Sequence, residues 1–106
     1  MPKSHFFRGS LVKSRCRFRN YQNQLVDPTG VTCTLMDPTG NETDYEYGVD
    51  AELTKSETGV YLLEIDTTDH SGEYRVKWLG TGSNQAAVDG IFYAYSPFEG
   101  EDMYGR

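Results

Sequence analysis

The chain has 106 residues, of which 37% are hydrophobic and 13% aromatic, so it is long enough for one domain with a modest core and too short for a catalytic domain with a separate lid. The aromatic content excludes a disordered chain, and no apolar run approaches the roughly 18 residues of a membrane-spanning helix. The net charge of -6 is unevenly distributed, because residues 1–26 hold six of the ten cations and none of the sixteen acids.

That distribution also ranks the partners. A nucleic-acid-binding protein is usually basic overall, so nucleic acid is the least favoured partner. The first residues, MPKSHFFRGS, carry cations without an apolar stretch, so we expect no secretory signal. We expect an N-terminal arm at residues 1–9, a β-sandwich domain at residues 10–96, and an acidic tail at residues 97–106 that orders only against a partner.

The segment LVKSRCRFRN, residues 11–20, predicts the first strand, since the side chains of a strand alternate between two faces. One face is uncharged and consists of Val12, Ser14, Cys16 and Phe18. The other face is cationic and consists of Lys13, Arg15, Arg17 and Arg19. Cations on an edge strand discourage pairing with another sheet, whereas arginine favours bidentate contacts with carboxylates. Both interpretations stay open, and an acidic protein partner is the favoured one.

Alternation continues along the chain between frequent turn residues, which predicts an all-β sandwich or barrel. The further runs expected to be strands are 31–36, 44–47, 60–65, 73–78 and 91–95. The most regular of them places Tyr74, Val76 and Trp78 opposite charged residues, so we expect Trp78 to be buried between two sheets.

Two kinds of connection stand out between these runs. The sequence DPTG occurs at residues 27–30 and again at 37–40, and we expect both to be similar turns at strand entries. The segment GVDAELTKSE, residues 48–57, has only Ala51 and Leu53 as apolar residues apart from a Val beside its first Gly. We expect it to be a loop or a single helical turn.

Two of the expected strands are apolar on both faces. The residues that should point away from the core, and that we take as candidate interaction residues beside the cations, are Val60, Leu62, Ile91, Tyr93 and Tyr95. One face of each strand can fill the core, but the other must meet something else. A second layer within the chain and a partner subunit are both open explanations.

Residues able to do chemistry are sparse. His70 ends a turn, residues 66–70, that also holds two Asp, but metal sites usually draw ligands from more than one element, so we expect a solvated turn. Cys16 and Cys33 fall on apolar strand faces, and without a secretory signal we expect two buried, unpaired thiols. We expect no enzyme, no cofactor and no metal.

The sequence DHSGEYRV, residues 69–76, resembles the corner of immunoglobulin-like domains at which an Asp, a Gly and a Tyr precede a core Cys, although the core residue here is Val76. A wider pattern covers residues 10–96. It combines a DP turn before a Val-rich strand, two Gly-x-Tyr strand entries, a Trp followed by Gly-Thr-Gly, and a closing Gly-x-Phe. This pattern resembles small immunoglobulin-like β-sandwich proteins encoded among the structural genes of tailed bacteriophages.

The resemblance implies an immunoglobulin-like antiparallel β-sandwich of about seven strands with a non-enzymatic role in the virion. It also implies that the partners are other phage virion proteins, such as the major capsid protein or neck and tail proteins, and that the chain is multi-copy or a homo-oligomer at the capsid surface or the head-tail neck. The alternative is a surface module that binds carbohydrate or a host through aromatic side chains. The aromatic residues available for that role are Tyr93, Tyr95, Phe98 and Tyr104.

Overall fold

The structure, a computed structural model, describes residues 4–82 and 86–95, and in this part of the chain it contains eight strands and no helix. The strands are β1 (Ser4–Phe7), β2 (Leu11–Arg17), β3 (Gly30–Met36), β4 (Glu42–Glu46), β5 (Leu53–Glu57), β6 (Val60–Asp66), β7 (Gly72–Thr81) and β8 (Ala86–Tyr95). The search for a helix long and apolar enough to cross a membrane finds none among the described residues.

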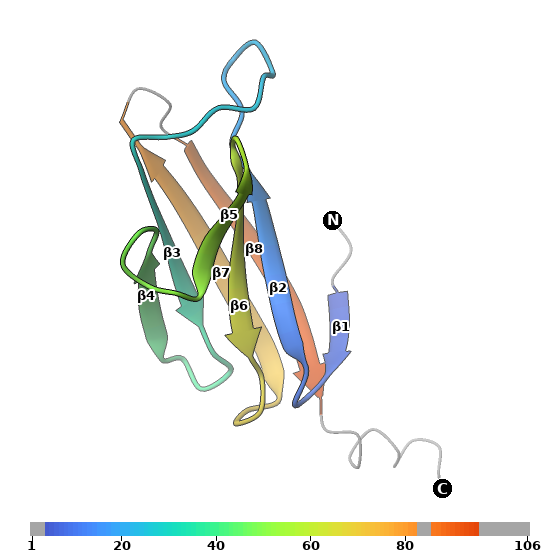
Figure 1. The fold of residues 1–106 in the computed structure, drawn as a ribbon. Coiled ribbons are helices and arrows are strands. Elements are labelled where there is room, and N and C mark those ends of the chain that lie inside the picture. Colours follow the sequence, from blue (N-terminus) through green and yellow to red (C-terminus); the bar gives the residue numbers. More distant parts are fainter. Residues whose placement is uncertain (1–3, 83–85, 96–106) are drawn as a thin grey trace, which may run out of the picture.

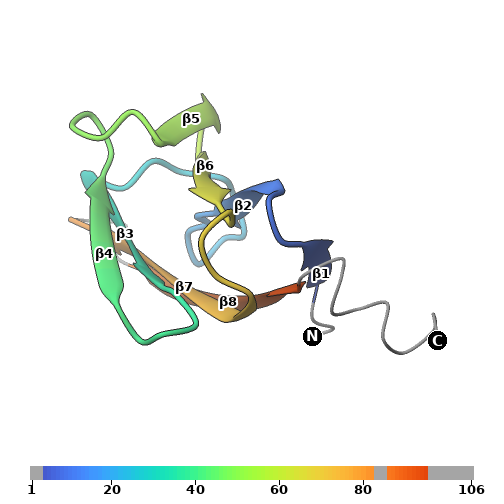
Figure 2. The same cartoon turned by 90° about the horizontal axis from the view of Figure 1, so that it is seen from below.

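The strands form two sheets that pack face to face (Figure 1). The larger sheet has the order β1-β8-β7-β3-β4, and the smaller has the order β2-β6-β5. Every pairing is antiparallel except that of β1 with β8. Seen from below, the two sheets form two layers, and the larger one extends beyond the smaller on both sides (Figure 2). The all-β prediction is therefore confirmed, with one strand more than the seven expected.

The core lies between the layers and is built by the alternation that the sequence predicts. The residues of the first strand face that point inward are Val12, Cys16 and Phe18, all buried, whereas Lys13, Arg15 and Arg17 are exposed. Trp78 is buried as expected, with 2% of its surface exposed, and its indole N–H donates to Ser14 Oγ across the two sheets at 3.4 Å. Burying a side chain of this size contributes strongly to the stability of a small domain.

Two expectations about local structure are wrong. The segment 48–57 is not a loop or a helical turn throughout, because its second half forms strand β5, paired with β6. Only Leu53 of this strand is buried, so an edge strand with one inward side chain left almost no apolar pattern to detect. The expected arm at residues 1–9 contains β1, whose pairing partner β8 lies at the other end of the sequence. The expected tail at 97–106 lies outside the described residues.

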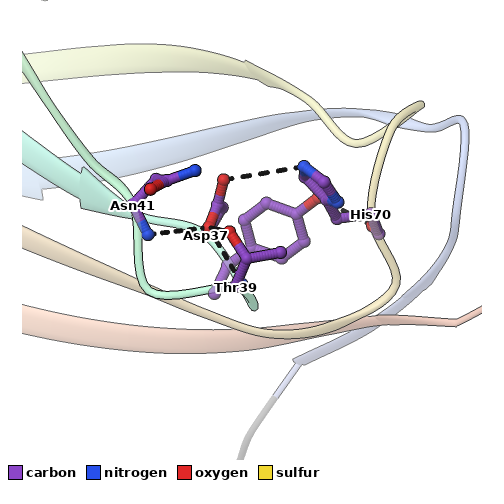
Figure 3. Close-up of polar contacts among 5 residues, drawn as sticks. Asp37, Thr39, Asn41 and His70 are labelled. Atoms are coloured by element: carbon purple, nitrogen blue, oxygen red, sulfur yellow. Dashed lines mark hydrogen bonds and ion pairs between the residues drawn. The ribbon is translucent and has the colours of Figure 1, made fainter.

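The two DPTG sequences were expected to form similar turns, but they adopt different structures. The second is a tight turn, in which Asp37 Oδ1 accepts hydrogen bonds from the backbone N–H of Thr39 and of Asn41 and from the Thr39 hydroxyl, and Gly40 has a φ of 95° (Figure 3). The first leads straight into β3, and its Asp27 reaches a different part of the chain. Identical tetrapeptides therefore adopt different roles, which the flanking strands decide.

Asp27 joins the segment before β3 to the hairpin of β5 and β6. Its Oδ1 accepts the N–H of Gly59 at 2.8 Å and the hydroxyl of Tyr61 at 3.1 Å, and its Oδ2 lies 2.7 Å from Lys55 Nζ. The hydrogen bond from Lys55 and that from Gly59 lower the pKa of Asp27. This carboxylate is thus a cross-link between elements, whereas Asp37 closes only its own turn.

The corner before β7 is fixed to the turn between β3 and β4. Tyr74 donates its hydroxyl to the carbonyl oxygen of His70 at 2.8 Å, four residues earlier. The imidazole of His70 lies toward Asp37, with 3.7 Å between Nε2 and Oδ2 (Figure 3). A tyrosine hydroxyl bonded back to the backbone just upstream is the corner contact that the sequence DHSGEYRV suggests.

Candidate interaction surfaces

The cations of the first predicted strand form a row on the outer face of β2, defined here as the basic row: Lys13, Arg15 and Arg17. All three are exposed. On the neighbouring strand β6 they stand opposite Glu64, Leu62 and Val60 respectively. Within the described residues no carboxylate lies within ion-pairing distance of any of the three. The row therefore holds three cations that the described part of the chain leaves unpaired.

Arg19, the fourth predicted cation, lies beyond the end of β2. It is exposed, and its Nη1 donates to the carbonyl oxygen of Asn23 at 3.1 Å in the following turn. Its backbone forms an isolated bridge with Leu25. Arg19 thus serves its own loop and is separate from the basic row.

On the side away from β6, the backbone groups of the basic row bond to no other described residue. The N–H of Thr67 donates to Ser10 and the N–H of Phe18 donates to Gly59, which shows that the even-numbered residues of β2 bond to β6. In an antiparallel pair the residues between them direct their N–H and C=O to the other side. That side is the open edge of the smaller sheet, because β2 is its terminal strand. The backbone groups at this edge consequently belong to the cationic residues.

A matching row of acids occupies β4, the terminal strand of the larger sheet; Glu42, Asp44 and Glu46 are defined here as the acidic row. All three are exposed and share the outer face, and Thr34 Oγ1 donates to Asp44 Oδ1 at 2.7 Å. The acidic row was not among the residues that the sequence predicted as a site. The pattern that could have found them is the same charge alternation that marked β2.

The backbone of β4 follows the same rule as that of β2. The N–H of Asp37 donates to the carbonyl oxygen of Asn41, and the N–H of Tyr47 donates to that of Val31. The backbone groups of the odd-numbered positions therefore face β3, and those of the even-numbered acids face the open edge. The backbone groups of Glu46 are already bonded, because its N–H donates to the Asp50 carboxylate and its C=O accepts from Asp50 N–H. The free part of this edge therefore consists of Glu42 and Asp44.

The apolar residues expected on outer faces are only partly available. Val60 is buried, with 3% of its surface exposed, so its prediction as an accessible interaction residue is wrong, since the chain itself covers it. Leu62 is half-buried between Arg15 on β2 and Thr54 on β5. It is the apolar part of the face that carries the basic row.

On the last strand the outer aromatic residues lie against β1. The ring of Tyr93 stacks on that of His5, with centroids 5.6 Å apart, and Tyr95 meets Phe7 edge to face. Tyr93 is half-buried and Tyr95 is 38% exposed. Strand β1, which lies in the expected arm, therefore covers part of the outer aromatic face of β8.

Ile91 lines a shallow groove on the outer face of the larger sheet. The groove has a volume of about 270 Å³, and its lining includes Met36, Glu42 and Arg75. Arg75 is itself paired with Glu73, with 3.0 Å between Nε and Oε2. The groove thus mixes apolar and charged side chains, and one wall of it is the beginning of the acidic row.

The groups that could do chemistry take structural positions. Burial raises the pKa of Cys16 to about 11 and that of Cys33 to about 12, and both thiols are free. Asp66 accepts the backbone N–H of Thr68 at 2.9 Å, as expected for a turn. No group of three or more His, Cys, Asp or Glu side chains is placed to hold a metal ion in the parts of the chain that the structure describes.

A scan against models of protein families finds no match for this chain, and a search of curated proteins finds none either.

Proposed function

We propose that the chain is a non-enzymatic structural protein of a tailed-phage virion, present in many copies, which attaches to other virion proteins through the basic row. The observation that carries the proposal is that Lys13, Arg15 and Arg17 lie exposed at an open sheet edge, where no carboxylate of residues 4–82 or 86–95 forms an ion pair with them. Arginine and lysine arranged in this way suit an acidic protein surface. Other virion proteins at the capsid surface or the head-tail neck are the partners that the sequence resemblance suggests.

The topology supports the immunoglobulin-like part of the proposal. In a variable-type immunoglobulin domain, the last two strands of the fold pair with the central strand and the strand that follows it, while the other sheet holds the remaining strands. The order β8-β7-β3-β4 opposite β2-β6-β5 follows that scheme. The bond from Tyr74 to His70 supplies the corner contact.

The chain departs from that scheme at the centre of the core. Immunoglobulin domains of antibodies carry a disulfide between the sheets and a Trp on the central strand. Here Val76 stands in place of the second Cys, and Trp78 lies on β7, directly opposite Cys33 of β3. The core therefore holds its two cysteines without a disulfide, which fits a protein that folds in a reducing cytoplasm before it joins a particle.

The experiment that tests the proposal measures attachment to particles. The variant R15E/R17E should fold as the unmodified chain does, since exposed substitutions usually cost little stability, but much less of it should co-sediment with particles. The matched control is R19E, which reverses an exposed arginine that lies beyond the end of β2 and outside the basic row. Equal co-sedimentation of both variants and the unmodified chain would overturn the role of the basic row.

A carbohydrate-binding module remains the second candidate because Tyr95 and Phe7 form an exposed aromatic pair. Exposed aromatic rings can stack on sugars, although here the two rings also pack against each other. Phe98 and Tyr104, the other aromatic residues expected for this role, lie outside the described residues. Binding of the purified chain to a glycan array, lost in a Y95A variant of unchanged stability, would favour this function over the structural one.

A further inference from the structure

Two of the four terminal strands of the sandwich, β2 and β4, carry opposite charges with the same spacing. The basic row occupies alternate positions of β2, and the acidic row occupies alternate positions of β4. In a strand, alternate residues on one face are separated by about 7 Å, so the two rows have the same repeat. Each row also coincides with the residues whose backbone groups point to the open edge. Charge and hydrogen-bonding capacity are therefore matched at both edges.

We infer that these two edges are the two halves of one interface between copies of this chain, in which β2 of one copy pairs antiparallel with β4 of the next. The backbone requires odd residues of β2 to stand opposite even residues of β4, and pairing all three charges then selects the register with Arg15 opposite Asp44 and Arg17 opposite Glu42. Lys13 then stands opposite Glu46, where the backbone of β4 is already bonded to Asp50. The inference rests on the multi-copy part of the proposed function and names the partner.

The charges also disfavour the pairing of either of these two edges with a second copy of itself. Two copies of β2 would bring cations together, and two copies of β4 would bring acids together, and like charges directly opposite each other destabilise a pair of strands. Specificity thus comes from repulsion as much as from attraction. Of the three possible pairings of these edges, only the one between unlike strands is favourable.

The shape of the molecule fits the same arrangement. On one side the larger sheet extends past β2 by β1, and on the other side it extends past β5 by β4 (Figure 2). The second copy can be turned over so that the outer faces of the two joined sheets lie on the same side. Its projecting strand β4 then lies beside β2 of the first copy and over β1 of that copy. The interface joins different surfaces of the two copies, so it is heterologous and generates a ring or an open chain of copies.

The test uses the purified full chain without particles. Sedimentation velocity over a range of protein concentrations should show reversible association that weakens as salt is added. The variants R15E/R17E and E42K/D44K should each associate at least about tenfold more weakly, because attractive pairs become repulsive. The control E52K/E57K, which reverses two exposed acids at β5 and touches neither row, should associate as the unmodified chain does. A chain that stays monomeric at all concentrations would overturn the inference.

Mixing gives the sharper result. R15E/R17E has two acidic edges and E42K/D44K has two basic edges, so the mixture should associate although each variant alone does not. The variant with all four reversals should associate by itself. A mixture that remains monomeric, with both variants folded, would contradict the pairing of these edges.

A measurement on the unmodified chain covers the case in which the variants fail to fold. A carbodiimide joins amines to carboxylates in direct contact, so it should link Lys13 of one copy to Glu46 of another, which peptide mass spectrometry locates. Covalent dimers in which Lys13 is linked elsewhere would overturn the register. An unmodified chain that binds particles but does not self-associate would reject this inference alone. One that self-associates but does not bind particles would reject the proposed attachment and leave the inference in place.

Discussion

At the scale of single residues, carboxylates that accept backbone hydrogen bonds decide how segments of this chain are fixed. Asp27 and Asp37 belong to identical tetrapeptides, yet one holds Gly59 and Tyr61 and the other closes a four-residue turn. The hydroxyl of Thr39 is the main cause that lowers the pKa of Asp37, and Lys55 is the main cause for Asp27. Hydrogen bonds to a carboxylate stabilise its ionised form.

These lowered pKa values predict that the protein loses stability in acid. A carboxyl group with a folded-state pKa below its ordinary value of about 3.9 stabilises the fold above that value, and the contribution is lost as the pH falls toward the folded-state pKa. The free energy of unfolding should therefore decrease between about pH 5 and pH 2. Urea unfolding followed by tryptophan fluorescence at several pH values measures it.

The variant D27N assigns part of this effect to Asp27. It should be less stable than the unmodified chain at neutral pH, and its stability should fall less steeply in acid. D69N removes the same charge from a carboxylate that accepts no hydrogen bond within the described residues, so it measures the effect of charge alone. Parallel curves for D27N and the unmodified chain would contradict the role assigned to Asp27.

At the scale of elements, the sequence predicted best the strands that have one clear inward face. The runs around Cys16, Cys33 and Trp78 alternate regularly, and each of these residues is buried. Strand β5 was not predicted because Leu53 is its only inward-pointing apolar residue. Strand β1 was not predicted because its pairing partner is far away in the sequence. Local pattern reports burial, but it does not report which distant strand completes a sheet.

The candidate site was predictable to the same degree. Alternation correctly placed the basic row on an exposed face, but it could not show that β2 lies at a sheet edge, which is a property of the topology. Val60 was wrongly predicted to be accessible, because a strand that is apolar on both faces does not show which other segments of the chain cover its outer side. The acidic row was overlooked because a run of acids in an acidic chain is unremarkable until its strand is known to be an edge.

Gly59 provides a prediction at the point where three elements meet. It has a φ of 76°, and a Cβ there would lie 2.9 Å from Val26 N and 3.0 Å from Phe18 O, whose hydrogen bond to each other it would disturb. Gly48 has a φ of 93° and open space around it. G48A should cost about 1 kcal/mol through backbone strain alone, and G59A should cost about 3 kcal/mol through strain and steric overlap.

Equilibrium unfolding of the two glycine variants measures the difference. Because both substitutions add the same methyl group at a positive φ, G48A controls for the backbone term. Equal losses of stability would show that the segment around Val26 can move aside, and the close packing of Gly59 would then have no energetic importance.

At the scale of the whole molecule, the two sheets enclose one core, and both thiols lie inside it. Since a thiolate is the reactive form and burial raises the pKa of both cysteines, the folded protein should resist alkylation at neutral pH. Cys16 and Cys33 belong to opposite sheets. Exposing them therefore requires the sheets to separate, which in a small domain is global unfolding.

We accordingly expect iodoacetamide to label both cysteines together or neither. Intact-protein mass spectrometry of a partly reacted sample at neutral pH should show chains with no label and chains with two labels. The reaction should accelerate by orders of magnitude in urea. Rapid labelling of one cysteine in native conditions, or a mass two hydrogens below the reduced value, would contradict this picture of the core.

The parallel pairing of β1 with β8 has a consequence for the order of folding. Its register joins Ser4 to Phe92, so this contact closes nearly the longest loop available to the chain, and such contacts form late. Until β1 arrives, the last four residues of β8, 92–95, present an unpaired and mostly aromatic edge that can recruit another chain. Strand β1 thus protects this edge against misassembly, and the rate at which it docks should set how fast newly made copies lose their tendency to aggregate.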